Sequence, residues 1–180
     1  MAKLEKIEFI SIPNVRIIGR EVTHSLNENS ENPVPALWDK ISSDGTIDML
    51  KKLPLAISEC TIGWMGDVEG QNFKYIAGVI ADENTPVPEG MQYRDLPACN
   101  IAQSYIYGNL QNGDVYSNAH ELTLSGIEAN KFSPDYHAGW SAEIYPDDVD
   151  FYETEGILCY FLPYKNTTTT PNGHNEHVSK

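Results

Sequence analysis

Short runs rich in β-branched and aromatic residues recur along the chain, a pattern typical of strands. Several of these runs alternate apolar and polar residues, as expected where one face of a sheet is buried. Turn-forming residues separate the runs, including Pro13-Asn14 between the first two. The pattern predicts strands at residues 6–12, 15–23, 60–65, 73–81, 92–97, 142–145 and 156–162.

Two other segments place apolar residues at helical spacing. The first starts at Asn32 and Pro33, and Asp44-Gly45 ends or kinks it; its apolar face comprises Val34, Leu37, Trp38 and Ile41. The second follows Asn112-Gly113, with Asp114 as its predicted N-cap, and its apolar face includes Val115, Ala119 and Leu122. Residues 82–90 are rich in turn formers and predict a linker, whereas residues 131–138 predict irregular structure.

The predicted elements follow the same order on either side of the linker. Each half begins with a bent strand and continues with a helix and two more strands, and Gly63-Trp64 corresponds to Gly139-Trp140. Agreement at several such positions favours an internal repeat over chance similarity between two α+β halves. We therefore predict one α+β domain over residues 1–164, with half-repeats at about 5–82 and 91–164. Residues 165–180 are polar and predict a disordered tail, whose His174 and His177 are not expected to form a metal site.

Charge and cysteine usage exclude several functional classes. The formal net charge is −14, and nucleic-acid binding relies on Lys and Arg, so no direct nucleic-acid partner is expected. Such a charge permits cationic ligands, although it is also a common means of keeping a protein soluble. The three cysteines form no CxxC pair, so no zinc site is expected. We predict neither a metal nor a cofactor. No signal-peptide core or long apolar run occurs, which predicts a cytoplasmic protein without membrane contact.

One carboxylate lies inside an apolar strand. Glu143 is flanked by Ala142 and Ile144, and burying an acid there is costly unless something compensates its charge. Tyr145 lies two residues further on and therefore points to the same face. On the last predicted strand, Tyr160 shares a face with Leu158 and Leu162. Glu143 is thus either a solvated acid on an exposed strand face or an anchor for a cation in an aromatic pocket.

The chain also resembles a known family. The resemblance rests on Ile12-Pro13 with the strand after it, and on residues 73–79, 88–97, 142–145 and 157–163. These pieces are similar, in order, to the GyrI-like small-molecule-binding domain and cover roughly residues 5–164. That superfamily includes gyrase-inhibitory proteins and the effector domains of multidrug-responsive AraC-type and MerR-type regulators.

The resemblance implies two βαββ (SHS2-like) repeats with pseudo-twofold symmetry, in which two helices on an antiparallel sheet flank a ligand groove. It implies that Glu143 contacts cationic aromatic ligands and that Tyr145, Tyr160 and Trp38 line the groove. Trp140, earlier on the Glu143 strand, is a further candidate. Family regulators carry a DNA-reading domain before this one, whereas this sequence starts at the domain itself. The expectation is a stand-alone form.

The leading hypothesis is a protein that captures cationic or amphipathic aromatic molecules without catalysis. Two alternatives stay open. Some relatives are hydrolases that open cyclopropane rings of genotoxins, and Glu143 with Tyr145 or Tyr160 would then act as an acid/base pair. Gyrase-inhibitory relatives instead imply a protein partner, either a regulator or gyrase. The sequence is compatible with a monomer or a homodimer.

Overall fold

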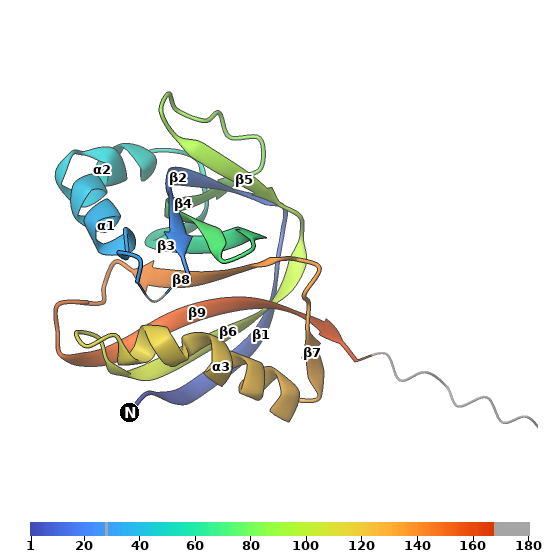
Figure 1. The fold of residues 1–180 in the computed structure, drawn as a ribbon. Helices are drawn as coiled ribbons and strands as arrows, with labels where there is room; N and C mark the ends of the chain where they lie inside the picture. The colour runs from blue at the N-terminus through green and yellow to red at the C-terminus, as the bar shows by residue number, and fades with distance from the viewer. Residues whose placement is uncertain (28, 168–180) are drawn as a thin grey trace, which may run out of the picture.

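Nine strands form one antiparallel sheet within residues 1–27 and 29–167, the part of the chain that the computed structural model describes (Figure 1). The strand order is β1-β6-β9-β8-β3-β4-β2-β5, and β7 pairs with β9. The strands are β1 (Lys3–Ile12), β2 (Val15–Ser25), β3 (Leu55–Glu69), β4 (Asn72–Asp82), β5 (Gln92–Leu96), β6 (Cys99–Asn109), β7 (Phe132–Pro134), β8 (Trp140–Pro146) and β9 (Glu155–Asn166). The helices are α1 (Val34–Ser43), α2 (Thr46–Leu50) and α3 (Asp114–Ala129).

The break at Pro13-Asn14 links the two halves of the chain. It lets β1 pair with β6 of the second half, while β5 of the second half pairs with β2 of the first. At this corner the side-chain oxygen Oδ1 of Asn14 accepts a hydrogen bond of 2.8 Å from the backbone N–H of Ala98. Since each half contributes an edge strand to the other, the two halves form one continuous sheet.

The sheet has two differently covered faces. One face curves around an apolar core to which both ends of the sheet contribute, including Ile17, Ile62, Trp64, Ile101 and Trp140. The other face carries the helices. On that face α3 packs on β6 and β9, whereas α1 and α2 pack on β2 and β4. Strands β8 and β3 lie between these two helical layers (Figure 1).

The mixed α+β class and the large antiparallel sheet are confirmed, and several predicted boundaries are corrected. Residues 131–138 are not all irregular, because Phe132–Pro134 forms β7 beside β9. Asp114 is the first residue of α3 rather than its N-cap, which is Gly113. Strand β9 runs to Asn166, two residues into the predicted tail, because its end pairs with β7. Residues 168–180, with His174 and His177, lie outside the described residues.

The predicted end or kink of the first helix at Asp44-Gly45 is confirmed. Gly45 has φ +82°, a backbone conformation that favours glycine, and it separates α1 from α2. No helix among residues 1–27 and 29–167 is long and apolar enough to cross a membrane.

Candidate functional site

Glu143 lies on the helix-bearing face of the sheet, at the junction of the two helical layers. In the β8 register it stands between Gly63 of β3 and Tyr160 of β9. Tyr160 belongs to the apolar cluster under α3, and Tyr75 of β4 belongs to the cluster under α1. Met65 packs against both clusters. The carboxylate therefore sits where side chains from both halves of the chain meet.

Two phenols donate hydrogen bonds to the same oxygen of Glu143. The O–H of Tyr145 lies 2.6 Å from Oε2, and the O–H of Tyr75 lies 2.8 Å from it. The indole N–H of Trp38 in turn donates to the Tyr75 oxygen at 2.9 Å. A chain of donors thus runs from α1 through β4 to the carboxylate on β8. Because each donor is bonded itself or packed, the arrangement is held in place before any ligand arrives.

Burial has the largest effect on the pKa of Glu143. It raises the pKa of Glu143 above the ordinary glutamate range, although the two phenol hydrogen bonds favour the ionised form. Burial and the nearby Glu143 charge hold the pKa values of Tyr75 and Tyr145 well above that of a free phenol. The same two causes raise the pKa of Tyr116 on α3 to about 12. All three phenols therefore stay protonated at neutral pH, and two of them serve as donors.

Glu143 has no cationic partner among the described residues, since no Lys, Arg or His there forms an ion pair with it. Both phenol hydrogen bonds go to Oε2. The second oxygen, Oε1, accepts no hydrogen bond from the described residues. It is not fully buried. The carboxylate thus keeps one oxygen accessible for a further partner.

Aromatic rings surround the carboxylate. The ring of Trp38 meets that of Tyr145 edge to face, with centroids 5.1 Å apart. The ring of Tyr145 also contacts that of Phe151, from the loop between β8 and β9, with centroids 4.9 Å apart. On α3, Nδ1 of His120 lies 3.2 Å from the hydroxyl of Tyr160. These rings offer apolar and π surfaces around one negative charge.

Gly63 makes room for this arrangement. A Cβ atom at position 63 would collide with the hydroxyl of Tyr75 and lie 3.1 Å from Oε2 of Glu143. Tyr75 is 2% exposed and packed under α1, so its ring has little freedom to move aside. The absence of a side chain at position 63 therefore permits the hydrogen bond between Tyr75 and Glu143.

The structure brings four of the five predicted site residues together. These are Glu143, Tyr145, Tyr160 and Trp38. It places Trp140 on the opposite face, in the core with Trp64, because Trp140 and Glu143 are three positions apart and side chains of a strand alternate between faces.

The sequence does not predict three further residues of this site: Tyr75, Gly63 and His120. The hydroxyl of Tyr75 donates to Glu143, and Gly63 lies opposite Glu143 on β3, whereas His120 lies beside the hydroxyl of Tyr160. The pairing of Gly63 with Ala77 and of Met65 with Tyr75 brings β4 beside this site. Only knowledge of that strand pairing could have pointed to Tyr75 from the sequence.

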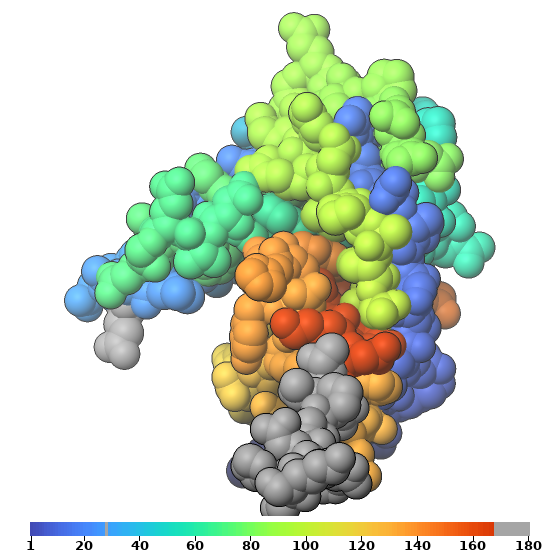
Figure 2. Space-filling model, turned by 90° about the vertical axis from the view of Figure 1, so that its right-hand side faces the viewer, coloured from blue at the N-terminus to red at the C-terminus, as the bar shows by residue number. Residues whose placement is uncertain are grey.

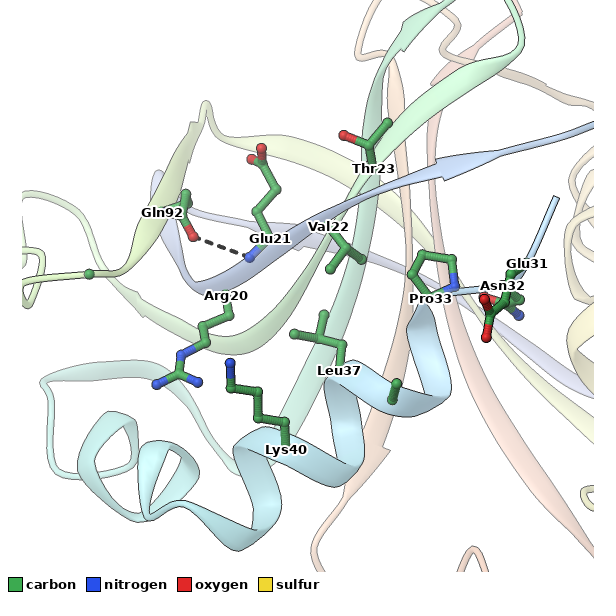
Figure 3. A pocket seen from close by; sticks show the side chains of 12 residues that line it. Arg20, Glu21, Val22, Thr23, Glu31, Asn32, Pro33, Leu37, Lys40 and Gln92 are labelled. Atoms are coloured by element: carbon green, nitrogen blue, oxygen red, sulfur yellow. Dashed lines mark hydrogen bonds between the residues drawn. The ribbon is translucent and has the colours of Figure 1, made fainter.

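Two surface pockets lie away from Glu143. One, of about 400 Å³, is lined by Trp64, Trp140 and Arg94, and its segments lie on the face shown in Figure 2. There the orange segment after β7 lies below the yellow-green segment around β5, and the β3–β4 hairpin projects to the left. The other, of about 600 Å³, lies between β2 and α1 (Figure 3). No group of three or more metal-ligating side chains is found within residues 1–27 and 29–167.

The raised pKa of Glu143 has a consequence for stability. A carboxyl group whose pKa is higher in the folded state stabilises the fold while protonated and loses that contribution as the pH rises through the folded-state pKa. Ionised Glu143 therefore destabilises the fold at neutral pH. We expect Glu143→Gln to raise Tm by about 2–4 °C at pH 7.5, corresponding to about 1 kcal/mol for a domain of this size. Calorimetry should find that this difference in Tm disappears at a pH below the ordinary pKa range of glutamate, where Glu143 is protonated. An equal difference in Tm at that pH would contradict the explanation.

The family model of the GyrI-like small molecule binding domain matches residues 5–165 of the chain. No curated protein matches the chain significantly in sequence.

Several solved structures share the fold. The structure of SAV2435 bound to tetraphenylphosphonium has a TM-score of 0.69 at 13% identity, covering 89% of this chain and 94% of that one. A protein from Staphylococcus aureus MU50, described as a bacterial transcription regulation protein, has a TM-score of 0.65 at 13% identity, with coverage of 89% and 99%. The C-terminal domain of EcmrR has a TM-score of 0.56 at 12% identity, with coverage of 90% and 98%. At such identities the likeness shows a common fold.

Proposed function

Because the chain belongs to the GyrI-like small-molecule-binding family, we propose that it captures cationic or amphipathic aromatic molecules, with Glu143 as the charged anchor. The main support for this proposal is the state of the Glu143 carboxylate. It is partly buried, lacks a cationic partner among the described residues and keeps Oε1 accessible. A cation that approached Oε1 would pair with a charge that the fold leaves uncompensated, and such pairing is stronger than in water.

The aromatic rings around Glu143 suit the rest of such a ligand. A cation gains about 0.5–2 kcal/mol from the face of a well-placed Tyr or Trp. Flat apolar groups can also stack on these rings, which would select ligands by shape and charge class rather than by one structure. Trp38 and Tyr145 lie in contact over the carboxylate and are only partly buried. In our proposal these two side chains move apart when a ligand enters.

The proposal extends to how the site is built. We infer that the two halves act as βαββ repeats related by pseudo-twofold symmetry, with α1 and α3 as the walls of a ligand groove over β8 and β3. The positions of α1 and α3 on either side of β8 support this arrangement. The only charged group that the proposed groove needs is Glu143, since Tyr160 and Trp38 supply ring surfaces. One end of the ligand would be charged and the other apolar.

Tetraphenylphosphonium is the probe for this function, because a similar structure was solved with that cation bound. We expect it to bind with a Kd of ~1–100 μM at pH 7.5, that is, about −8 to −5.5 kcal/mol, and to change the fluorescence of Trp38. Isothermal titration should give one site per chain. If no heat or fluorescence change appears up to millimolar probe, the proposed function is wrong.

The affinity should depend on pH in a defined direction. The ionised form of Glu143 binds the cation, and burial raises its pKa, so affinity falls as the pH drops through that raised value. Burial lowers the pKa of His120, which therefore gains its positive charge only in acid and weakens binding there too. Titrations between pH 7.5 and 4.5 check this direction. In the Glu143→Gln variant, only the small change in affinity caused by protonation of His120 should remain. Affinity that rises toward acid would contradict an ionised anchor.

A further inference from the structure

The outer edge of β2 is only partly covered by its neighbour. Strand β5 pairs with β2 from Val15 to Gly19, whereas β4 pairs with the opposite edge from Val15 to Ser25. From Arg20 to Ser25, the outer edge therefore has no strand neighbour among the described residues. An unpaired edge presents backbone N–H and C=O groups to any segment that lies beside it.

Two hydrogen bonds identify the residues that face outward at this edge. The backbone N–H of Glu21 donates to the side-chain oxygen of Gln92 at 3.2 Å, and the hydroxyl of Ser30 donates to the carbonyl of Ser25 at 3.2 Å. Backbone groups of an antiparallel strand point to the same side at every second residue, so Thr23 faces outward as well. Within residues 1–27 and 29–167, no group forms a hydrogen bond with the backbone N–H or C=O of Thr23. The middle of the edge is thus available for pairing.

A pocket of about 600 Å³ runs along this edge, with α1 as its opposite wall. In Figure 3 the side chains of Val22 and Leu37 point toward each other across it. Arg20 and Lys40 come together at one end of the pocket, while Glu21 and Thr23 point away from α1. Side chains of a strand added to β2 would enter this pocket at every second position.

The charged side chains are distributed unevenly along the pocket. Nη1 of Arg20 lies 2.7 Å from a carboxylate oxygen of Asp44, and Lys40 forms no ion pair with a described residue. Glu21, on the other face of the strand, is already paired with Arg94 at 2.7 Å and with Lys74 at 3.5 Å. Although the chain has a formal net charge of −14, Lys40 therefore adds a positive charge at the end of the pocket beside Arg20, and no described acid forms an ion pair with it. It complements an acidic side chain.

We propose that this edge and pocket bind an extended peptide segment of a partner protein, which pairs with β2 around Thr23. An apolar side chain of the peptide occupies the space between Val22 and Leu37. An acidic side chain two positions away lies beside Arg20 and Lys40, because Arg20 and Val22 are themselves two residues apart on one face. Addition of a strand to an exposed sheet edge is a general mode of peptide recognition. The site is separate from Glu143 and does not depend on the ligand proposed there.

A second copy of the chain fits this edge less well. A symmetric dimer uses the same patch on both subunits, so the patch has to be self-complementary. Here Gln92 lies at one end of the pocket and residues 31–33 lie at the other. A single extended segment can lie between these two ends and does not have to be self-complementary.

The test uses two fluorescein-labelled hexapeptides of alternating threonine and valine, each with one glutamate two positions before or after a central valine. Both orders are needed because either strand direction can pair with an edge. In fluorescence anisotropy we expect one of them to bind, and ¹⁵N chemical shifts should move at Thr23 and Val22. N-methylation of the backbone amides that face β2 should weaken binding at least tenfold. Lys40→Glu should weaken it about tenfold, while Lys52→Glu, the same charge change on exposed chain outside the pocket, should not.

Three outcomes would overturn the proposal. The first is the absence of a shift at Thr23 with millimolar peptide. The second is unchanged affinity after N-methylation, which would mean that the pocket recognises side chains alone, as a small-molecule site does. The third is a concentration-dependent dimer in sedimentation whose formation covers Thr23, which would assign the edge to a second copy.

Discussion

Glu143→Gln is expected to bind tetraphenylphosphonium about 5–150-fold more weakly than the parent protein at pH 7.5. The substitution removes the negative charge but keeps the shape of the side chain, and its amide oxygen can still accept from Tyr145 and Tyr75. What is lost is the attraction between a desolvated carboxylate and the cation, for which about 1–3 kcal/mol is a reasonable magnitude. Isothermal titration of both proteins under the same conditions measures the difference.

Glu8→Gln is the matched control. Glu8 on β1 also accepts a hydrogen bond from a phenol, that of Tyr105 at 2.9 Å, but its side chain is 38% exposed and already paired with Lys6. Its substitution removes the same charge from the protein and should leave the affinity within twofold. Equal losses in the two variants would show that net charge attracts the cation and that Glu143 is no specific anchor. Unchanged binding in Glu143→Gln would remove Glu143 from the site.

Gly63→Ala is expected to destabilise the protein by about 1–3 kcal/mol, the usual range for inserting an atom into a packed interior. The new Cβ would collide with the Tyr75 hydroxyl, whose ring is held under α1 and by the N–H of Trp38. Tyr75 has to shift, and its hydrogen bond to Glu143 breaks or lengthens. We expect Tm to fall by about 2–10 °C and cation affinity to fall with it.

Gly108→Ala on β6 provides the comparison for this variant. A Cβ there would lie 3.0 Å from atoms of Ala2 and Val115, which is a milder contact than the collision at position 63. Ala2 also lies near the N-terminus. Thermal unfolding of both variants separates the general effect of a methyl group in a strand from the specific collision at position 63. A Gly63→Ala protein as stable as Gly108→Ala, with parental affinity, would contradict the role assigned to Gly63.

Local periodicity explains which parts of the fold were predictable. The spacing of Leu37 and Ile41 predicts the buried face of α1, and both are buried. The same holds for Val115 and Ala119 on α3, whereas Leu122 is only partly buried. These predictions depend on neighbours within a few residues, where side-chain direction follows from helix geometry. The short β7 was missed because only its pairing with β9 makes it a strand.

The candidate site divides in the same way. Strand alternation alone places Glu143 and Tyr145 on one face, since they lie two residues apart, and it also separates Trp140 from them once the start of β8 is known. The arrival of Tyr75 depends on β4 pairing with β3, which in turn pairs with β8. No spacing within the sequence encodes that order of strands.

Residue type and local periodicity are enough to predict an α+β chain with an acid and a phenol on one face of an apolar strand. The positions of Tyr75 and Trp38 as donors around Glu143, the space left by Gly63 and the part of the β2 edge that no described strand covers depend on the tertiary fold. Strand order and register are set by contacts between segments far apart in the chain, and no local pattern reports how much apolar surface those contacts bury together.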